Sequence, residues 1–175
     1  MTPGRQSVIE QLRKLLAAKT LILGIGNTMR EDDGVGPYFA SLCEPREDLL
    51  AFDCGEAPEK YIGKAISEKP DTVLLADAAD FGGEPGEIRL LDMDEIRTRG
   101  ISTHDISLKI LVDYLLREGR PKIVFLAFQP CATRLGRELS EDLKLSARRV
   151  ARELALAPPN CGGGPYEREE NNTDR

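Results

Sequence analysis

The amino-acid sequence predicts a single α/β domain of three layers, in which a twisted, mostly parallel five-stranded sheet carries helices on both faces. Two observations predict this fold class. Short apolar runs rich in β-branched residues alternate with segments whose apolar residues recur at helical spacing. Strands that alternate with helices in this way favour a parallel sheet covered on both faces. The chain also has 175 residues, which suits one ordinary domain rather than two.

The first half of the chain predicts three helices and three strands. The expected helices are 5–18, 35–43 and 58–68, where apolar residues repeat at helical spacing and Pro58 suits a first helical turn. The expected strands are 21–25, 49–53 and 72–77. The run at 21–25 is short, apolar and β-branched, which is typical of a buried strand.

The second half predicts two more strands and three more helices. Residues 87–91 alternate polar and apolar side chains, as an edge strand half exposed to water would. The last strand is expected at 122–128, and helices are expected near 93–98, at 106–118 and from about 140 to 156, with Ser140 as the cap of the last one. The domain is therefore expected to span 1–157, followed by a flexible tail at 158–175 that is rich in glycine and charge.

Composition excludes several classes of function. The net charge is −6 and the sequence pI about 5.0, which argues against a nucleic-acid binder, since such proteins normally present a basic face. No apolar run reaches the roughly 18 residues needed to cross a bilayer, so no membrane insertion is expected. Charged residues interrupt positions 1–20, so we expect no signal peptide and a cytoplasmic protein with reduced thiols.

Three residues are candidates for a metal or acid–base site. His104 is the only histidine, and it lies just before an expected helix. Asp33 follows the first strand by a short loop, and Asp77 ends the third strand. Because parallel sheets bind ligands beyond the carboxyl ends of their strands, we expect all three at one rim of the sheet. Two carboxylates and an imidazole suit a borderline divalent ion.

Each candidate also has a structural interpretation. Asp32 and Asp33 precede an expected helix, where aspartate is favoured as a cap, and one of them could cap while the other faces a ligand. Asp77 could cap the turn after its strand. His104 could be a surface residue or a helix cap.

The Gly24–Asn27 loop also suggests a nucleotide-binding module. A glycine-rich loop after a strand, with Asp53 ending the next strand, resembles part of a dinucleotide fingerprint. However, Met29 stands where the third glycine is needed, and three nearby acids would repel phosphate. A Cys131–His104 nucleophile is a further alternative, and it requires the fold to bring the two together.

Six segments occur in an order that carries a family resemblance. They are Gly24-Ile25-Gly26-Asn27 with Asp33-Gly34-x-Gly36-Pro37, Asp53-Cys54-Gly55-x-Ala57-Pro58-Glu59, Leu75-Ala76-Asp77-Ala78-Ala79-Asp80-Phe81-Gly82, Glu84-Pro85-Gly86-Glu87-Ile88-Arg89, Thr103-His104-x2-Ser107-Leu108 and Phe128-Gln129-Pro130. From about residue 20 to 156 the chain resembles the hydrogenase maturation endopeptidases, closest to the hydrogenase-3 type.

The resemblance implies a cytoplasmic protease that removes a carboxyl-terminal extension from the nickel-loaded large-subunit precursor of a [NiFe] hydrogenase. It implies that Asp33, Asp77 and His104 are the catalytic and metal-binding residues, and that the precursor presents the nickel. We expect a monomer. Asn27 and Gln129 lie on rim loops, where each either contacts the precursor chain or forms a turn. The nucleophile is either a water activated by the metal or a water activated by a carboxylate. A non-catalytic nickel-binding maturation factor is the remaining alternative.

Three departures from the family pattern bear on partner choice rather than on these ligands. Many members have Gly-Gly where this chain has Cys54-Gly55. Residues 1–19 precede the usual start and suggest an added helix, and the tail carries no recognisable motif.

Overall fold

The computed structural model describes residues 7–15, 19–92, 95 and 105–156. Its five strands are β1 (Thr20–Ile25), β2 (Leu49–Gly55), β3 (Thr72–Ala78), β4 (Ile88–Leu91) and β5 (Lys122–Phe128). They form one sheet in the order β2-β1-β3-β5-β4, in which β4 alone runs antiparallel to its neighbour. The predicted fold class is confirmed, and each predicted strand agrees with the structure to within two residues at either end.

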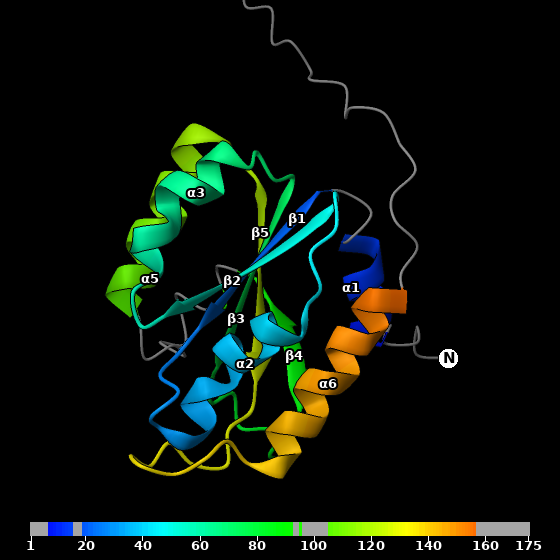
Figure 1. Cartoon of the computed structure of the whole chain (residues 1–175), viewed down its shortest axis with the longest axis vertical. Coiled ribbons are helices and arrows are strands. Elements are labelled where there is room, and N and C mark those ends of the chain that lie inside the picture. The colour runs from blue at the N-terminus through cyan, green and yellow to red at the C-terminus, as the bar shows by residue number, and fades with distance from the viewer. Residues whose placement is uncertain (1–6, 16–18, 93–94, 96–104, 157–175) are drawn as a thin grey trace, which may run out of the picture.

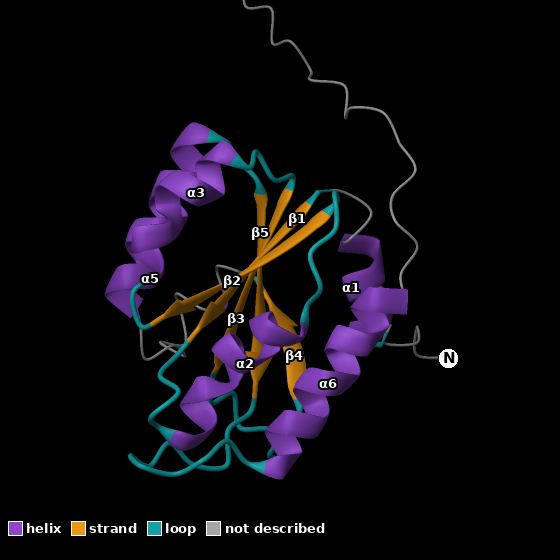
Figure 2. Ribbon diagram, in the orientation of Figure 1, coloured by secondary structure: helices purple, strands orange, loops and turns teal. Residues whose placement is uncertain are grey.

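Helices cover both faces of this sheet (Figures 1 and 2). They are α1 (Val8–Leu15), α2 (Val35–Leu42), α3 (Ile62–Ser67), α5 (Asp105–Glu118) and α6 (Glu141–Leu156), with short 3-10 helices η1 (Glu31–Gly34) and η2 (Pro58–Tyr61). Among the described residues, no helix is both long and apolar enough to cross a lipid bilayer. The helix expected near 93–98 lies outside the described residues except for Glu95, and the tail expected at 158–175 lies wholly outside them.

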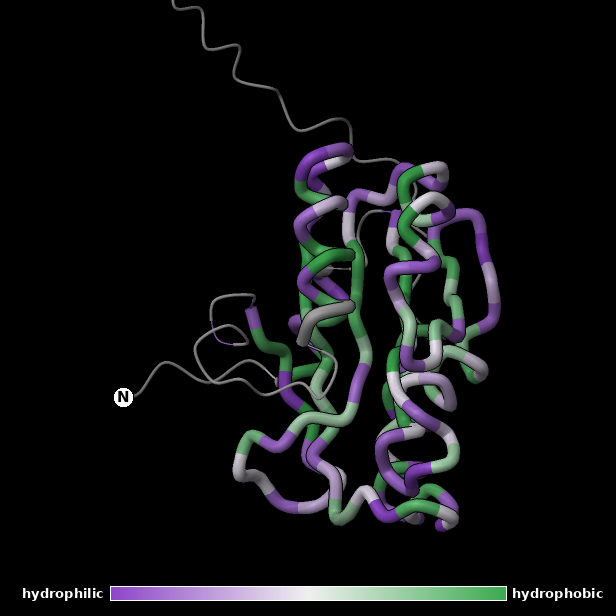
Figure 3. The backbone as a smooth tube through the Cα atoms, turned by 90° about the vertical axis from the view of Figure 1, so that its left-hand side faces the viewer, coloured by the Kyte–Doolittle hydropathy of each residue, from purple (hydrophilic) through white to green (hydrophobic). Residues whose placement is uncertain are grey.

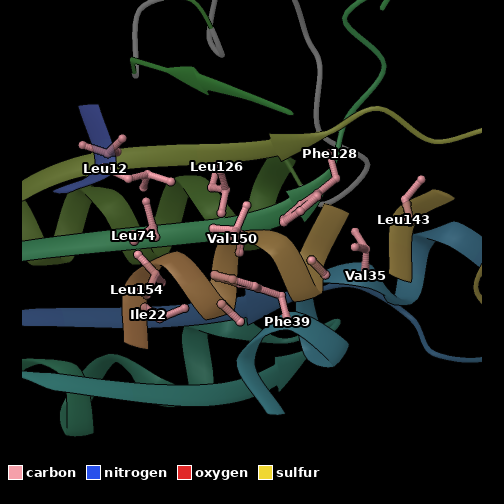
Figure 4. Packing of buried hydrophobic residues seen from close by; sticks show 14 of the residues in the cluster. Leu12, Ile22, Val35, Phe39, Leu74, Leu126, Phe128, Leu143, Val150 and Leu154 are labelled. Atoms are coloured by element: carbon pink, nitrogen blue, oxygen red, sulfur yellow. The ribbon is translucent and has the colours of Figure 1, made fainter. Parts of the chain in front are cut away.

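Each face of the sheet has its own apolar core. On one face α2 and α6 pack on the strands, and Figure 4 shows Phe39 of α2 and Val150 of α6 among the side chains that fill this core. Leu12 of α1 joins the same core. On the other face α3 and α5 bury residues such as Ala65 and Leu111. The helices alternate hydrophilic and hydrophobic residues, as expected of helices that present one face to a sheet (Figure 3).

The strand order places a topological switch between β1 and β3. After β1 the chain moves outward to β2, then returns to pair β3 on the other side of β1. The connection through α2 lies on one face, and the connection through η2 and α3 lies on the other (Figure 2). Ligands in open α/β sheets bind at such a switch, beyond the carboxyl ends of the strands. The carboxyl ends of β1 and β3 are thus the expected location of the functional site.

Ser140 does not cap α6 in the way that the sequence predicts. Its Oγ is buried and has no hydrogen-bond partner among the described residues. Its carbonyl oxygen accepts a hydrogen bond from the Lys144 amide, and its own amide donates to the Asp32 carboxylate. The backbone of Ser140, rather than its side chain, therefore positions the start of α6.

Candidate functional site

Asp33 and Asp77 lie together at the switch point. Asp33 belongs to η1 directly after β1, and Asp77 is the last residue but one of β3. Both are buried, with exposed fractions of 4% and 0%. Gly26 lies between them: a Cβ at this position would clash with the Asp33 carbonyl oxygen and lie 3.6 Å from Oδ1 of Asp77. Since φ of Gly26 is +137°, glycine is the residue that suits this position, and it lets the backbone of Asp33 lie against the end of β1.

The turn that carries Asp33 is closed by its own hydrogen bonds. Oδ2 of Asp33 accepts a hydrogen bond of 3.0 Å from the amide of Asn27. Oδ1 of Asn27 accepts a hydrogen bond of 2.8 Å from the amide of Met29. The Asn27 side chain thus shapes the turn, and its contact with a substrate stays a prediction.

Asp32 holds a distant loop rather than the start of η1 or α2. Its Oδ1 accepts a hydrogen bond from the Ser140 amide at 2.8 Å, and its Oδ2 accepts from the Cys131 amide at 2.8 Å and the Ala132 amide at 3.4 Å. Neither η1 nor α2 has a side-chain hydrogen bond at its cap, so the helix-cap interpretation is wrong. Asp32, which is 0% exposed, instead joins the 131–140 loop to the turn of Asp33.

Glu31 makes a second connection to the same loop. Its carboxylate accepts hydrogen bonds from Nε and Nη2 of Arg134 at 3.1 and 3.2 Å, and from the Arg134 amide at 3.2 Å. The Arg134 side chain thereby lowers the pKa of Glu31 below its ordinary value. Glu31 has a φ of +47°, a conformation that non-glycine residues rarely adopt. The surrounding contacts therefore fix the turn in a conformation that this residue would not choose alone.

Gln129 organises the loop that follows Asp77. Its Oε1 accepts hydrogen bonds from the amides of Phe81 and Gly83, both at 3.0 Å, and its Nε2 donates to Oδ1 of Asp80 at 3.1 Å. This contact and the Gly82 amide lower the pKa of Asp80. With 6% of its surface exposed, Gln129 acts as a support for the rim. Its predicted contact with a substrate stays a prediction.

His104, the third candidate ligand, lies outside the described residues. The helix that follows His104 in the sequence, α5, belongs to the described residues, and its contacts show where it begins. α5 packs against η2, which follows the carboxyl end of β2. After α5 the chain enters β5 at the opposite edge of the sheet, where the Lys122 amide donates a hydrogen bond to the Asp71 carbonyl just before β3. α5 therefore begins at the rim of Asp33 and Asp77. Within the described part of the chain, no three His, Cys, Asp or Glu side chains cluster as a complete metal site.

The described cysteines include two unreactive thiols. Burial raises the pKa of Cys43 to about 12. Burial, together with the nearby charge of Asp53, raises the pKa of Cys54 to about 12. Both thiols therefore stay protonated near neutral pH, where the thiolate would be the nucleophile. Cys131 is exposed, and its amide donates to Asp32. The Cys131–His104 pair stays a prediction, because His104 lies outside the described residues.

The glycines of the Gly24–Asn27 loop serve the packing of the chain itself. A Cβ on Gly24 would overlap the carbonyl oxygen of Gly36, and a Cβ on Gly36 would overlap the carbonyl oxygens of Ile25 and Ala76. Close packing of β1, α2 and β3 thus accounts for these glycines without a bound nucleotide. The Asp53 carboxylate accepts a hydrogen bond from the Gly55 amide, and this contact closes a turn at the end of β2. The nucleotide-binding interpretation therefore loses its structural basis.

Comparison with known proteins gives one consistent result. A family model described as hydrogenase maturation protease matches residues 35–156. The hydrogenase 3 maturation protease of Escherichia coli K12 is 34% identical over 153 residues, which are 86% of this chain and 97% of that protein.

Solved structures agree with this match. The crystal structure of the [NiFe] hydrogenase maturation protease HycI from Thermococcus kodakarensis KOD1 superposes with a TM-score of 0.75 at 37% identity, covering 83% of this chain and 96% of that one. The hydrogenase maturating endopeptidase HybD from Escherichia coli, with a TM-score of 0.65 at 20% identity over 78% of this chain and 89% of its own, shares the fold. A rim with two buried acids, a fold of this kind and relatives of this similarity lead to one conclusion: the chain belongs to the hydrogenase maturation protease family, and it is a peptidase.

Proposed function

We propose that this protein is the endopeptidase that removes a carboxyl-terminal extension from the nickel-loaded large-subunit precursor of a [NiFe] hydrogenase. Family membership supports the reaction class, and the relative from Escherichia coli, which matches over nearly its whole length, is named for hydrogenase 3. We therefore assign the substrate to a hydrogenase of that type.

The observation that carries the proposal is the position of Asp33 and Asp77. Two buried acids lie at the switch point of the sheet, where Gly26 contacts the backbone carbonyl of Asp33 and the carboxylate of Asp77. Burial of carboxylates costs free energy unless a cation or hydrogen bonds compensate. Carboxylate oxygens and an imidazole suit a borderline divalent ion such as nickel. In this proposal His104 supplies the imidazole, and the nickel arrives as part of the precursor.

The chemistry that follows is hydrolysis of one peptide bond by water. The water oxygen bonds to the carbonyl carbon, its proton passes to a base, and the leaving nitrogen takes up a proton. Asp33 and Asp77 are the bases that the rim provides. In the alternative route the precursor's nickel lowers the pKa of a bound water. In both routes the carboxylates position the precursor's metal centre next to the peptide bond that is cut.

We also propose that the protein acts as a monomer in the cytoplasm. The described cysteines Cys43, Cys54 and Cys131 are free thiols, which is typical of a reducing compartment. Size-exclusion chromatography coupled to light scattering would check the monomer.

The proposal is tested by mixing the purified protein with nickel-loaded and with nickel-free large-subunit precursor and weighing the products by mass spectrometry. We expect loss of a carboxyl-terminal peptide from the loaded precursor alone. Equal cleavage of both forms would contradict the role of nickel. Cleavage of neither form would contradict the peptidase assignment for this substrate and favour a non-catalytic nickel-binding factor.

A further inference from the structure

The turn before Asp33 and the loop between β5 and α6 form one continuous piece of the rim. The Gly136 amide donates to the Met29 carbonyl at 2.9 Å, and the Glu31 amide donates to the Arg137 carbonyl at 3.1 Å. In Figure 1 the yellow 129–140 loop runs along the lower edge of the molecule, beside the blue turn after β1. Segments about a hundred residues apart in the sequence therefore lie side by side.

The connection between these segments is made by side chains as well as by the backbone. The buried carboxylate of Asp32 accepts three backbone amide hydrogen bonds from the loop. The carboxylate of Glu31 accepts hydrogen bonds from the side chain and from the backbone amide of Arg134. Such contacts order a loop before any partner arrives. Binding to an ordered loop costs less conformational entropy than binding to a mobile one.

This ordered rim exposes two large apolar side chains. Met29 is 64% exposed and Leu135 is 73% exposed, the two highest values for large apolar residues in the described part of the chain. The Gly136–Met29 hydrogen bond brings the backbones that carry them together. A single exposed apolar residue is ordinary, whereas an adjacent pair on a fixed loop beside a candidate site indicates a contact surface. Methionine also adapts its shape to varied apolar partners.

The exposed charged residues around this pair are mostly arginines. Arg30, Arg134 and Arg137 are exposed on the two segments, although the net charge is −6. Arg134 is bound to Glu31, which leaves Arg30 and Arg137 with Glu138 as their exposed acidic neighbour in the sequence. Such a surface complements an apolar segment that carries acidic groups, as the end of a polypeptide with its terminal carboxylate does.

We infer that Met29, Arg30 and Leu135, called here the rim surface, bind the precursor's polypeptide chain next to its nickel centre. The occupant is an apolar segment of the precursor with a carboxylate beside it. This inference rests on the proposed function. Met29 and Arg30 belong to the same turn as Asp33, so the rim surface lies beside this candidate ligand. The rim surface thus contributes to substrate affinity, and it takes no part in the chemical step.

The test uses the full-length double variant Met29→Ser/Leu135→Ser with nickel-loaded precursor. We expect KM to rise roughly tenfold with little change in kcat, as for the loss of well-placed apolar contacts at an interface. The control is Leu156→Ser, which removes a 63% exposed apolar side chain at the far end of α6 and should leave KM unchanged. The conservative variant Met29→Leu/Leu135→Met should restore the KM of the wild type.

The outcomes separate this inference from the proposed function. Failure of the wild-type protein to cut any loaded precursor would overturn the proposed function and this inference with it. Cleavage by the wild type, with equal KM values for the double variant and Leu156→Ser, would overturn the rim surface alone. A fall in kcat at unchanged KM would also overturn it, because that result places the two residues in the chemical step. Circular dichroism of the exposed-site variants confirms that they are folded.

Discussion

Gly24 and Gly36 face each other so closely that a Cβ on Gly24 would overlap the Gly36 carbonyl oxygen and lie 2.8 Å from the Cβ of Ala40. This contact lets α2 lie directly on β1. The neighbouring backbone has little freedom to move, because β1 is buried along its whole length.

The first prediction concerns this contact. Gly24→Ala should destabilise the protein by about 1–3 kcal/mol or more, because overpacking forces the backbone to shift. The control is Gly63→Ala in α3, where a Cβ would meet nothing within 4 Å. That change should stabilise the protein by about 0.5–1 kcal/mol, the usual gain from removing a helical glycine. Chemical denaturation would measure both, and equal effects of the two changes would contradict the packing account.

The second prediction concerns the buried carboxylate of Asp32. Asp32→Asn places an amide group where one carboxylate oxygen now accepts backbone hydrogen bonds from Cys131, Ala132 or Ser140. We expect a loss of about 1–3 kcal/mol in the free energy of unfolding, measured with urea, because a buried donor then meets a buried donor. The exposed control Glu141→Gln should change stability little. An Asp32→Asn protein as stable as the wild type would show that Asp32 does not hold the loop.

The third prediction concerns pH. Arg134 lowers the pKa of Glu31 below its ordinary value of 4.5. A carboxylate whose pKa is lowered by folding stabilises the folded state above its unfolded pKa, and this contribution is lost as the pH falls through the folded pKa. Arg134→Gln should therefore lower stability at neutral pH, and the difference from the wild type should shrink as the pH falls below 4.5. A difference that stays constant across the titration would contradict the ion pair.

The fourth prediction concerns the cysteines. Because burial raises the pKa values of Cys43 and Cys54 to about 12, neither thiol should react with iodoacetamide near neutral pH in the folded protein. Cys131 is exposed and should react. Mass spectrometry of peptides after labelling, with denatured protein as the control, checks both statements. Cys131→Ser should still cut the precursor, because the proposed nucleophile is water; loss of cleavage in this folded variant would favour a cysteine nucleophile.

The strands and the position of the site follow from local sequence patterns. The apolar run that ends at Asp77 predicts a buried strand with an acid at its carboxyl end, and the structure has both. The short loop after β1 likewise predicts Asp33 at the same rim. Both predictions use neighbours in the sequence, so they require no knowledge of distant contacts.

The role of Asp32 depends on distant contacts, and the sequence patterns missed it. The partners of the Asp32 carboxylate lie about a hundred residues later in the chain. Those partners are backbone amides, which carry no residue-specific signal. A sequence clue did exist in the second acid beside Asp33, since two adjacent acids seldom serve one purpose. For Gln129 the sequence predicts either a substrate contact or a turn-forming role; its side chain binds the loop at Phe81 and Gly83, and the substrate contact stays a prediction.

The most direct test of the central claim compares cleavage of nickel-loaded precursor by the wild type, by Asp77→Asn and by the matched control Asp53→Asn. Asp53 is an exposed acid near the carboxyl end of β2, on the same edge of the sheet. Asp77→Asn keeps the shape of the side chain but removes the charge that would bind the precursor's metal. We expect it to lower kcat/KM by at least about 100-fold, while Asp53→Asn cuts like the wild type and both variants stay folded. Equal cleavage by Asp77→Asn and the wild type would contradict the account.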